Sequence, residues 1–261
     1  MADSCNRWTW AGASVLGTSH EGNDLPKQDY AATAEYESAQ GPVLAIVVCD
    51  GAGSAACSHI GARTACLSLH SLIRSYLSQN GLVRNLNEQK SEVWLNEVRR
   101  QILTLTQTTD LALREFATTV SVALLADDSL FVLMVGDSPC VFYDGTNWFS
   151  PIWPMRGEYA NQTYFVTQDP LPFWRCVTLK TSLAKAAVFT DGIEKLVLRE
   201  GKKEIFDPFF NGLFEDFPKV GLKGRDREFS DGLKSFLSSA RVNNLTDDDK
   251  TLVIAARPPI K

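Results

Sequence analysis

The sequence predicts an α+β fold, and three observations carry this prediction. Strand-like apolar runs occupy the first fifty residues and return after residue 118, and two long segments with helical spacing lie between them. Short acidic turns at 127–128 and 144–145 join neighbouring runs in the manner of β-hairpins. Because hairpins pair their strands antiparallel, we expect antiparallel sheets packed with helices.

The composition indicates one domain, spanning residues 1–261. The chain is 44% hydrophobic, which is ample for a sizeable core, and it shows no repeat or linker. Its net charge of −5 comes from interspersed residues of both signs, so no nucleic-acid partner is expected. No apolar run approaches the about 20 residues of a membrane span, and we expect no membrane association and a cytoplasmic location. The six cysteines include no Cys-x-x-Cys pair and are expected to be reduced.

The first strands are predicted at residues 8–15 and 30–36. We expect these two strands to pair with each other across a polar loop at 18–28. Residues 44–49 form a continuous apolar run, which favours a strand buried on both faces. Asp50 follows this run directly, and the glycines after it allow the backbone to turn sharply.

Two amphipathic helices are predicted next. Apolar side chains recur at three- and four-residue spacing over 62–77, which indicates a helix of about 20 residues that ends near Asn80. The same spacing returns from about Glu88, with apolar and charged residues on opposite faces. Asn87 is placed to cap the start of this second helix.

Beyond residue 118 the period changes to that of strands. The predicted elements are, in order, hairpins at 119–135 and 141–149, an irregular segment at 151–172, a strand at 184–190, helices within 206–217 and 229–237 around a charged loop, and a last strand at 251–256. The irregular segment is long for a loop in a compact domain, and such loops are commonly functional or disordered.

Carboxylates stand at the ends of several predicted strands. Asp50, Asp137 and Asp191 each follow an apolar run beside a glycine, Asp29 opens a strand, and the run at 247–249 precedes the last strand. Each one alone is explained as a turn, a helix cap or a solvated loop. Together they are not, because strand ends gather at a sheet edge, where several buried carboxylates would repel one another unless cations neutralise them.

This donor set predicts magnesium or manganese, since hard cations prefer oxygen ligands. A zinc site is not expected, because the three histidines show no ligand spacing with cysteine. Two ions bridged by one carboxylate would lie about 3.5–4 Å apart and hold a hydroxide for in-line attack on a phosphate ester. Phosphoryl hydrolysis is therefore the predicted chemistry.

Six short motifs follow one another along nearly the whole chain. They are Gln28-Asp29, Val48-Cys49-Asp50-Gly51, Thr118-Thr119-Val120, Val135-Gly136-Asp137-Ser138, Phe189-Thr190-Asp191-Gly192 and Asp248-Asp249-Lys250-Thr251. In order and spacing, the set resembles the metal-dependent protein phosphatases of type 2C, and the segments 17–20 and 157–163 resemble the bacterial branch of that family. The resemblance implies a four-layer α-β-β-α sandwich, in which helices flank two antiparallel sheets.

The resemblance also assigns roles to individual residues. It implies that Asp50 bridges two ions, that the carbonyl of Gly51 binds one of them, and that Asp191 and Asp248 complete the other. These three aspartates are the candidate catalytic residues. Two further metal candidates are Asp29, acting directly or through ordered water, and Asp137, at the position of a third, weaker ion.

The sequence departs from the family pattern at three positions. Ala52 stands where animal members have a histidine proposed to protonate the leaving group, and Asp24 stands where a phosphate-binding arginine is common. His20 is the candidate substitute for that arginine, with a structural histidine as the alternative. Lys195 replaces a carboxylate for the third ion, so that ion is weak or absent, or Lys195 contacts phosphate. The segment 151–172 corresponds to the family's flap beside the catalytic cleft.

The implied function is a serine/threonine protein phosphatase that uses two Mn²⁺ or Mg²⁺ ions. Its implied partner is a phosphorylated protein of the kind that a serine/threonine kinase produces, and we expect a monomer. Two alternatives stay open. The absent arginine and Lys195 favour a catalytically impaired module that binds phosphoproteins, and a small phosphorylated metabolite is a third substrate class, since fold does not determine substrate.

Overall fold

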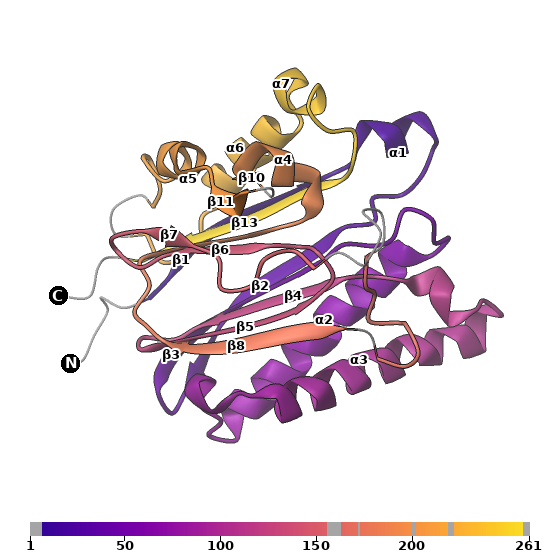
Figure 1. The fold of residues 1–261 in the computed structure, drawn as a ribbon, viewed down its shortest axis with the longest axis horizontal. Coiled ribbons are helices and arrows are strands. Elements are labelled where there is room, and N and C mark those ends of the chain that lie inside the picture. Colours follow the sequence, from indigo (N-terminus) through magenta and orange to yellow (C-terminus); the bar gives the residue numbers. More distant parts are fainter. Residues whose placement is uncertain (1–6, 156–162, 172, 200–201, 219–221, 258–261) are drawn as a thin grey trace.

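The structure is a four-layer sandwich, which confirms the predicted fold class. It is a computed structural model that describes residues 7–155, 163–171, 173–199, 202–218 and 222–257. Two sheets pack face to face, and helices cover the outer face of each (Figure 1). The neighbouring strands pair antiparallel apart from one short parallel contact between β1 and β12.

The sheets are built from strands that are mostly far apart in the sequence. Sheet 1 has the order β12 (Gly224–Arg225), β1 (Thr9–Val15), β13 (Lys250–Ala256), β9 (Lys185–Phe189), β6 (Cys140–Tyr143) and β7 (Trp148–Phe149). Sheet 2 has the order β2 (Tyr30–Ser38), β3 (Gly41–Cys49), β4 (Val120–Leu125), β5 (Ser129–Val135) and β8 (Trp174–Lys180). A separate small hairpin consists of β10 (Leu198–Arg199) and β11 (Glu204–Ile205).

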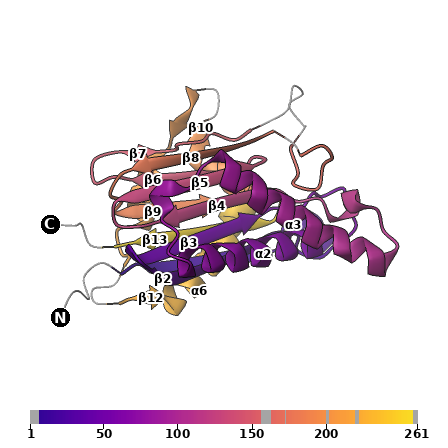
Figure 2. The same ribbon diagram turned by 90° about the horizontal axis from the view of Figure 1, so that it is seen from below.

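The helices divide between the two outer faces. Sheet 2 is covered by α2 (Ser58–Ser78) and α3 (Glu88–Thr109), with the 3₁₀ turns η1 (Val83–Asn85) and η2 (Leu113–Phe116) nearby (Figure 2). On the sheet 1 side lie α1 (Thr18–Gly22), η3 (Asp191–Ile193), α4 (Glu194–Val197), α5 (Asp207–Leu213), α6 (Arg227–Leu237) and α7 (Ala240–Asn243). The predicted helices are confirmed, as is the Asn87 cap, whose side chain accepts a hydrogen bond from Lys90 N at 3.0 Å.

Three apolar cores separate the four layers, and strand β3 shows why. Its alternate residues Val43, Ala45 and Val47 pack towards α2 and α3, whereas Leu44, Ile46 and Val48 pack between the sheets. A third core lies between sheet 1 and the helices α5 and α6. Burying one such side chain stabilises the fold by about 1.5–3 kcal/mol. Because β3 is buried on both faces, it holds the residue that follows it, Asp50, in a fixed position.

The structure corrects the predicted pairing of the first two strands. β1 pairs with β13 and β12, and β2 pairs with β3, so the two strands lie in different sheets. Parts of the predicted loops are also ordered: α1 lies in the first loop, and β12 lies in the charged loop before α6. Strand β8 was not expected, because its half-exposed residues show no clear alternation.

The described residues cover only part of what was predicted for the cysteines, the membrane spans and the flap. Among the described residues, five cysteines are free, and Cys5 lies outside the described ranges. No helix in the described ranges is both long and apolar enough to cross a bilayer. The segment 157–162 of the predicted flap also lies outside the described residues.

The topology brings the acidic strand ends to one edge of the sandwich. β3 and β5 both pair antiparallel with β4, so they run in the same direction and end on the same side, at Asp50 and Asp137. In sheet 1, the end of β9 adjoins the start of β13, where Phe189 pairs with Leu252. Asp191 is thereby placed beside the 247–249 run.

Candidate active site

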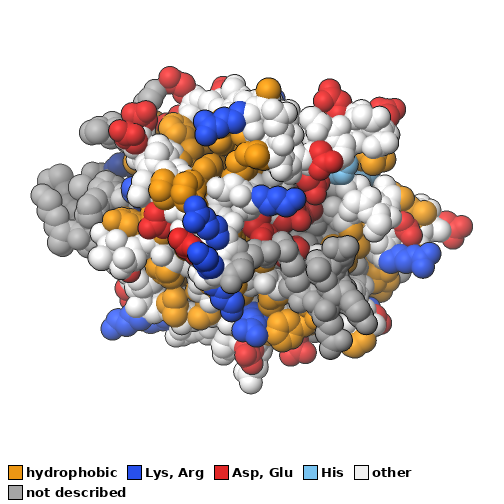
Figure 3. Space-filling view, turned by 45° about the horizontal axis from the view of Figure 1, so that its top comes forward, with side chains coloured by type: hydrophobic (Ala, Val, Ile, Leu, Met, Phe, Trp, Pro, Cys, Tyr) orange, Lys and Arg blue, Asp and Glu red, His pale blue; other side chains and the backbone are white. Residues whose placement is uncertain are grey.

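A cavity of about 260 Å³ opens where these strand ends meet, and we call it the catalytic cavity. Its described lining includes five carboxylates, one histidine, two glycines and two threonines: Asp50, Asp137, Asp191, Asp247, Asp248, His20, Gly51, Gly53, Thr119 and Thr163. Acidic side chains gather near the centre right of the face in Figure 3. Among the described residues, the lining therefore contains more carboxylates than cationic side chains.

The main chain of Asp50 is fixed by hydrogen bonds to Thr118 and Thr119. Thr119 N and Thr118 Oγ1 donate to the Asp50 carbonyl at 2.8 and 3.0 Å, and Asp50 N donates to Thr119 Oγ1 at 3.0 Å. These bonds satisfy the main chain of Asp50 and leave its carboxylate to the cavity. The Thr118-Thr119 pair, which the sequence showed only as part of a motif, thus positions the central carboxylate.

Gly51 and Gly192 are required by close packing rather than by a left-handed backbone. A Cβ on Gly51 would lie 2.8 Å from both the Gln28 carbonyl oxygen and Ser58 Cβ. A Cβ on Gly192 would lie 1.8 Å from the carbonyl oxygen of Asp249. The two Asp-Gly turns can approach neighbouring backbone only because they carry no side chain there. This contact brings Asp191 next to the 247–249 run.

Asp249 ties three segments together behind the catalytic cavity. Its Oδ1 accepts from Gly17 N at 2.7 Å and lies 3.0 Å from His20 Nδ1, and its Oδ2 accepts from Gln28 N at 2.5 Å. The side chain is 3% exposed. Asp249 therefore orients His20 and the start of β2. The sequence did not distinguish it from its neighbours in the acidic run.

Asp29 lies behind the catalytic cavity and is not part of its lining. Its Oδ2 accepts from Thr190 Oγ1 at 2.8 Å and from Thr251 Oγ1 at 2.7 Å. Burial raises the pKa of Asp29 to about 7, and the charge of Asp249 adds to this, although the threonine hydrogen bonds and Lys27 lower it. This position suits action through an intermediate water better than direct ligation.

Two lysines, the half-buried Lys27 and the buried Lys250, offset part of the acidic charge from behind the catalytic cavity. Lys27 Nζ donates to the Asp29 carbonyl at 2.5 Å and to Ser14 Oγ at 2.6 Å. Lys250 is fully buried and donates to the Asp248 carbonyl at 3.0 Å. Desolvation lowers the pKa of both amines, and the nearby carboxylates oppose this. Neither lysine was a site candidate from sequence, because single lysines beside aspartates are common on surfaces.

Asp137 lies on the far wall of the catalytic cavity, beside the end of the flap segment. Thr163 Oγ1 donates to Asp137 Oδ2 at 2.9 Å. Thr163 and Phe165 both line the catalytic cavity, so the described end of the 151–172 segment does reach it. The sequence could not have paired these residues, because they are 26 positions apart and belong to no common motif.

The pKa of Asp50 reflects its burial among the other carboxylates of the site. Burial raises the pKa of Asp50 well above its usual range, and the charges of Asp29, Asp191, Asp248 and Asp137 raise it further. Within the described ranges, no three His, Cys, Asp or Glu side chains are already arranged to hold a metal ion. The donor set nevertheless fits hard divalent cations, because it is all oxygen and its mutual repulsion is relieved by positive charge.

The structure brings most of the predicted site residues together. Asp50, Gly51, Asp137, Asp191, Asp248 and His20 line one cavity. Lys195 does not: it is exposed on α4 and is absent from the lining. Ala52, at the position of the absent histidine, does line the cavity.

A four-layer sandwich with a carboxylate-lined cavity at one end of its sheets is the arrangement that the motifs indicated for type 2C phosphatases. The profile of the family described as Protein phosphatase 2C matches residues 16–238. The chain therefore belongs to the protein phosphatase 2C family, and the resemblance seen in the motifs is confirmed.

Individual relatives agree with this assignment. The chain is 34% identical over 256 residues to serine/threonine-protein phosphatase 3 of Escherichia coli K12, a match that covers 95% of this chain and 98% of the relative. Two solved structures with the same fold are a bacterial serine phosphatase (TM-score 0.63, 14% identity, 97% and 98% of the two chains covered) and the catalytic domain of the phosphatase PstP in complex with two manganese ions (TM-score 0.62, 12% identity, 96% and 98% covered).

Proposed function

We propose that this protein is a serine/threonine protein phosphatase that depends on manganese or magnesium. The observation that supports it most directly is the convergence of Asp50, Asp137, Asp191 and Asp248 on one cavity, in a chain of the protein phosphatase 2C family. The function of the E. coli relative, as its name states it, points the same way.

In this proposal Asp50, Asp191 and Asp248, with the Gly51 carbonyl, hold two divalent ions, and Asp137 offers a position for a third. Such ions lower the pKa of water and offset the charge that develops on a phosphoryl group. The protein's part is to orient these carboxylates through the Thr118-Thr119 and Asp249 contacts. Asp29 acts from behind the catalytic cavity, through water.

His20 is the residue proposed to contact the phosphate. It lines the catalytic cavity, and Asp249 Oδ1 lies 3.0 Å from its Nδ1. Lys195 contributes less in this proposal, because it is exposed outside the cavity lining. With Ala52 in place of an acid, the leaving alkoxide takes its proton from solvent.

The test is hydrolysis of phosphoserine, phosphothreonine and phosphotyrosine peptides with manganese, with magnesium and with chelator. We expect turnover of the first two peptides, abolished by chelator and restored by metal. Failure to hydrolyse both a phosphopeptide and an aryl phosphate in manganese would overturn the proposal.

The same assay separates the two alternatives. A phosphoprotein-binding module would bind the phosphothreonine peptide in calorimetry without turnover. A metabolite phosphatase would hydrolyse small phosphomonoesters and leave peptides intact. The crowded carboxylates favour the enzyme over the binding module, because a pure anion-binding site would not place five aspartates around its ligand.

We further propose that the protein acts as a monomer in the cytoplasm on the products of serine/threonine kinases. Size-exclusion chromatography with light scattering tests the oligomeric state, and fractionation of cells that express the protein tests its location.

A further inference from the structure

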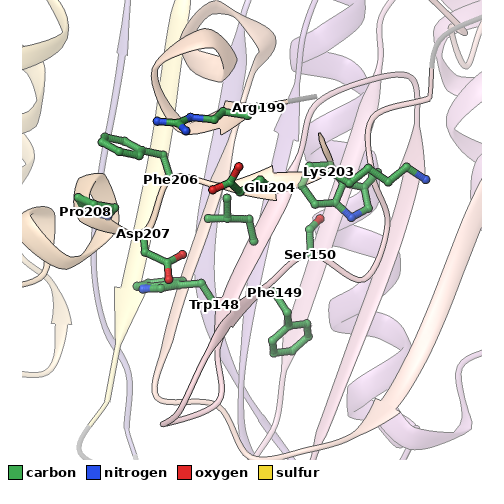
Figure 4. A pocket seen from close by; sticks show the side chains of 11 residues that line it. Trp148, Phe149, Ser150, Arg199, Lys203, Glu204, Phe206, Asp207 and Pro208 are labelled. Atoms are coloured by element: carbon green, nitrogen blue, oxygen red, sulfur yellow. The ribbon is translucent and has the colours of Figure 1, made fainter. Parts of the chain in front are cut away.

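A second cavity of about 620 Å³, larger than the catalytic cavity, lies over β7 and the β10–β11 hairpin (Figure 4). Its walls come from three segments: β7 with the loop after it, the β10–β11 hairpin, and the start of α5. We call it the docking cavity. A volume of this size lies in the range of about 300–1,000 Å³ that is typical of ligand pockets.

One wall of the docking cavity is rigid. Trp148 Nε1 donates to Asn211 Oδ1 at 2.9 Å, and the indole ring packs 5.0 Å from the Phe210 ring and 5.5 Å from the Phe214 ring. The Trp148 ring makes a further contact with the ammonium of Lys185, which lies 6.0 Å from the ring centroid. A wall held on so many sides keeps its shape without a ligand, which lowers the entropic cost of binding.

The lining of the docking cavity combines a balanced set of charges with several aromatic and aliphatic side chains. Its four charged residues, Arg199, Lys203, Glu204 and Asp207, cancel in sign. The Arg199 guanidinium lies 5.3 Å from the Phe206 ring centroid, and the Lys203 side chain points away from the two carboxylates in Figure 4. The remaining walls are largely aromatic or aliphatic, including a half-buried Trp153.

Two backbone hydrogen bonds link segments that line the docking cavity to segments that carry residues of the catalytic cavity. Met155 N, two residues after Trp153, donates to the carbonyl of Gly136 at 3.2 Å, and Gly136 precedes Asp137. On the other side, Phe206 N donates to the carbonyl of Val197 at 2.8 Å, and Val197 ends the short helix that follows Asp191. In Figure 3 an apolar patch lies on the same face as the acidic cluster, over the region where Figure 1 places β7, β11 and α5.

We propose that the docking cavity binds a large apolar side chain of the phosphoprotein substrate, several residues away in the substrate chain from the phosphorylated residue. This inference rests on the proposed phosphatase function. A segment that occupies both cavities must cross the face between them, so one side of the phosphoresidue and one spacing are favoured. An aromatic side chain buried in a preformed pocket is the type of contact that dominates peptide affinity.

The test uses phosphothreonine peptides in which every flanking residue is alanine or serine, and a single phenylalanine is placed in turn at each position on either side. We expect wild-type protein with manganese to show about tenfold higher kcat/KM for one small group of spacings, through a lower KM and an unchanged kcat, the size typical of a buried aromatic anchor. An aryl phosphate, which is too small to reach the docking cavity, serves as the internal reference.

Trp153→Ala removes one wall of the docking cavity and no residue of the catalytic cavity. It is expected to abolish the preference for phenylalanine, whereas Trp153→Phe keeps most of it, and both leave turnover of the aryl phosphate unchanged. Phe236→Ala is the matched control, because it removes an exposed aromatic ring on α6 outside both cavities. Circular dichroism verifies that each variant is folded.

Equal kcat/KM for all peptides in the wild type, or an unchanged preference in Trp153→Ala, overturns the proposal. A wild-type protein that hydrolyses neither peptide nor aryl phosphate contradicts the proposed function instead. In that case calorimetry with the same series of phosphothreonine peptides decides on docking: tighter binding of one group of phenylalanine peptides, lost in Trp153→Ala, supports it, and equal binding of all peptides refutes it.

Discussion

Two clusters of charge lie at opposite ends of strand β13, and they are built in opposite ways. At its start, Asp248 and Asp249 adjoin the catalytic cavity, in whose described lining carboxylates outnumber cationic side chains. At its end, the buried Arg257 donates to Asp127 Oδ1 at 2.5 Å and to the Leu183 and Ala126 carbonyls at 2.9 and 3.2 Å. The first cluster holds an excess of one charge, and the second is neutralised within the protein.

This difference separates a site from a structural support. Arg257 also lies 4.6 Å from the Trp8 ring centroid, so its charge, its donors and its flat face all have partners within the chain. The catalytic cavity is the reverse case, because burial raises the pKa of Asp50 and four other carboxylates raise it further. Carboxylates crowded in this way favour the binding of a cationic ligand.

The largest expected effect comes from removing one charge at the acidic end. Asp50→Asn is expected to lower phosphopeptide turnover on the order of 10³-fold, since bound metal contributes several kcal/mol to such reactions. The same change relieves repulsion, so the chelated variant should melt at or above the temperature of the chelated wild type. Turnover assays and calorimetric melting measure the two effects.

Asp231→Asn is the control for this experiment, because it changes an exposed carboxylate on α6. It should alter neither quantity. Wild-type-like turnover in Asp50→Asn contradicts the assignment of the catalytic cavity.

The neutralised end should respond in the opposite way. Arg257→Met removes the donor to the Asp127 carboxylate and to three carbonyls, and each buried acceptor left unsatisfied typically costs about 1–3 kcal/mol. Urea denaturation should therefore show a large loss of stability, with turnover per folded molecule unchanged. Arg84→Met is the matched control, since Arg84 and Asp128 form an exposed pair at 3.7 Å. Equal losses in the two variants would contradict the contrast drawn here.

Asp249→Asn changes a carboxylate that adjoins the catalytic cavity but, like Asp127, has hydrogen-bond partners within the protein. An amide has one acceptor oxygen, so it cannot serve both Gly17 N and Gln28 N, and a lost buried bond costs about 1–3 kcal/mol. Manganese affinity should fall by about 10–100-fold, as it does when other groups that orient ligands are removed. Calorimetric titration of manganese measures this, with Asp231→Asn, an exposed aspartate on α6 outside the catalytic cavity, as the control. A change in stability alone would assign Asp249 a purely structural role.

The smallest expected effect concerns His70, a buried neutral group. Its Nε2 donates to the Ala32 carbonyl at 3.0 Å, so Nδ1 is left to accept from Tyr36 OH at 2.9 Å. Burial lowers the pKa of His70, although the Ala32 bond opposes this. The unfolded chain therefore takes up a proton first, and stability should decline as pH falls below about 6.5.

Comparison with His70→Gln isolates this contribution from those of the other histidines and the carboxylates. The stability difference between wild type and variant should shrink from about pH 7 to about pH 5.5. A difference that stays constant over this range contradicts a lowered pKa of His70 in the folded protein.

Local patterns in the sequence predicted most elements but not their partners. The helices α2 and α3 and the β4–β5 hairpin follow from periodicity and turn chemistry, which involve near neighbours. The β1 strand instead pairs with β13, which lies at the other end of the chain, and no local pattern specifies that choice. Edge strand β8 carries no clear alternation and was missed for this reason.

The same limit applies to the candidate site. Asp50, Asp137 and Asp191 were predicted because each follows an apolar strand, which places it at a sheet edge. Asp249 and Thr163 were missed because their roles depend on contacts with segments far away in the sequence. Sequence thus predicted the acidic residues themselves, and tertiary structure was needed to find the groups that orient them.

The most direct measurement is calorimetric titration of manganese into chelator-treated wild-type protein, with turnover of a phosphothreonine peptide measured at each metal concentration. The account predicts that about two ions bind, that turnover rises as they bind, and that the chelated protein is inactive but folded. Full turnover in chelator, or a folded protein that binds no manganese, would contradict it.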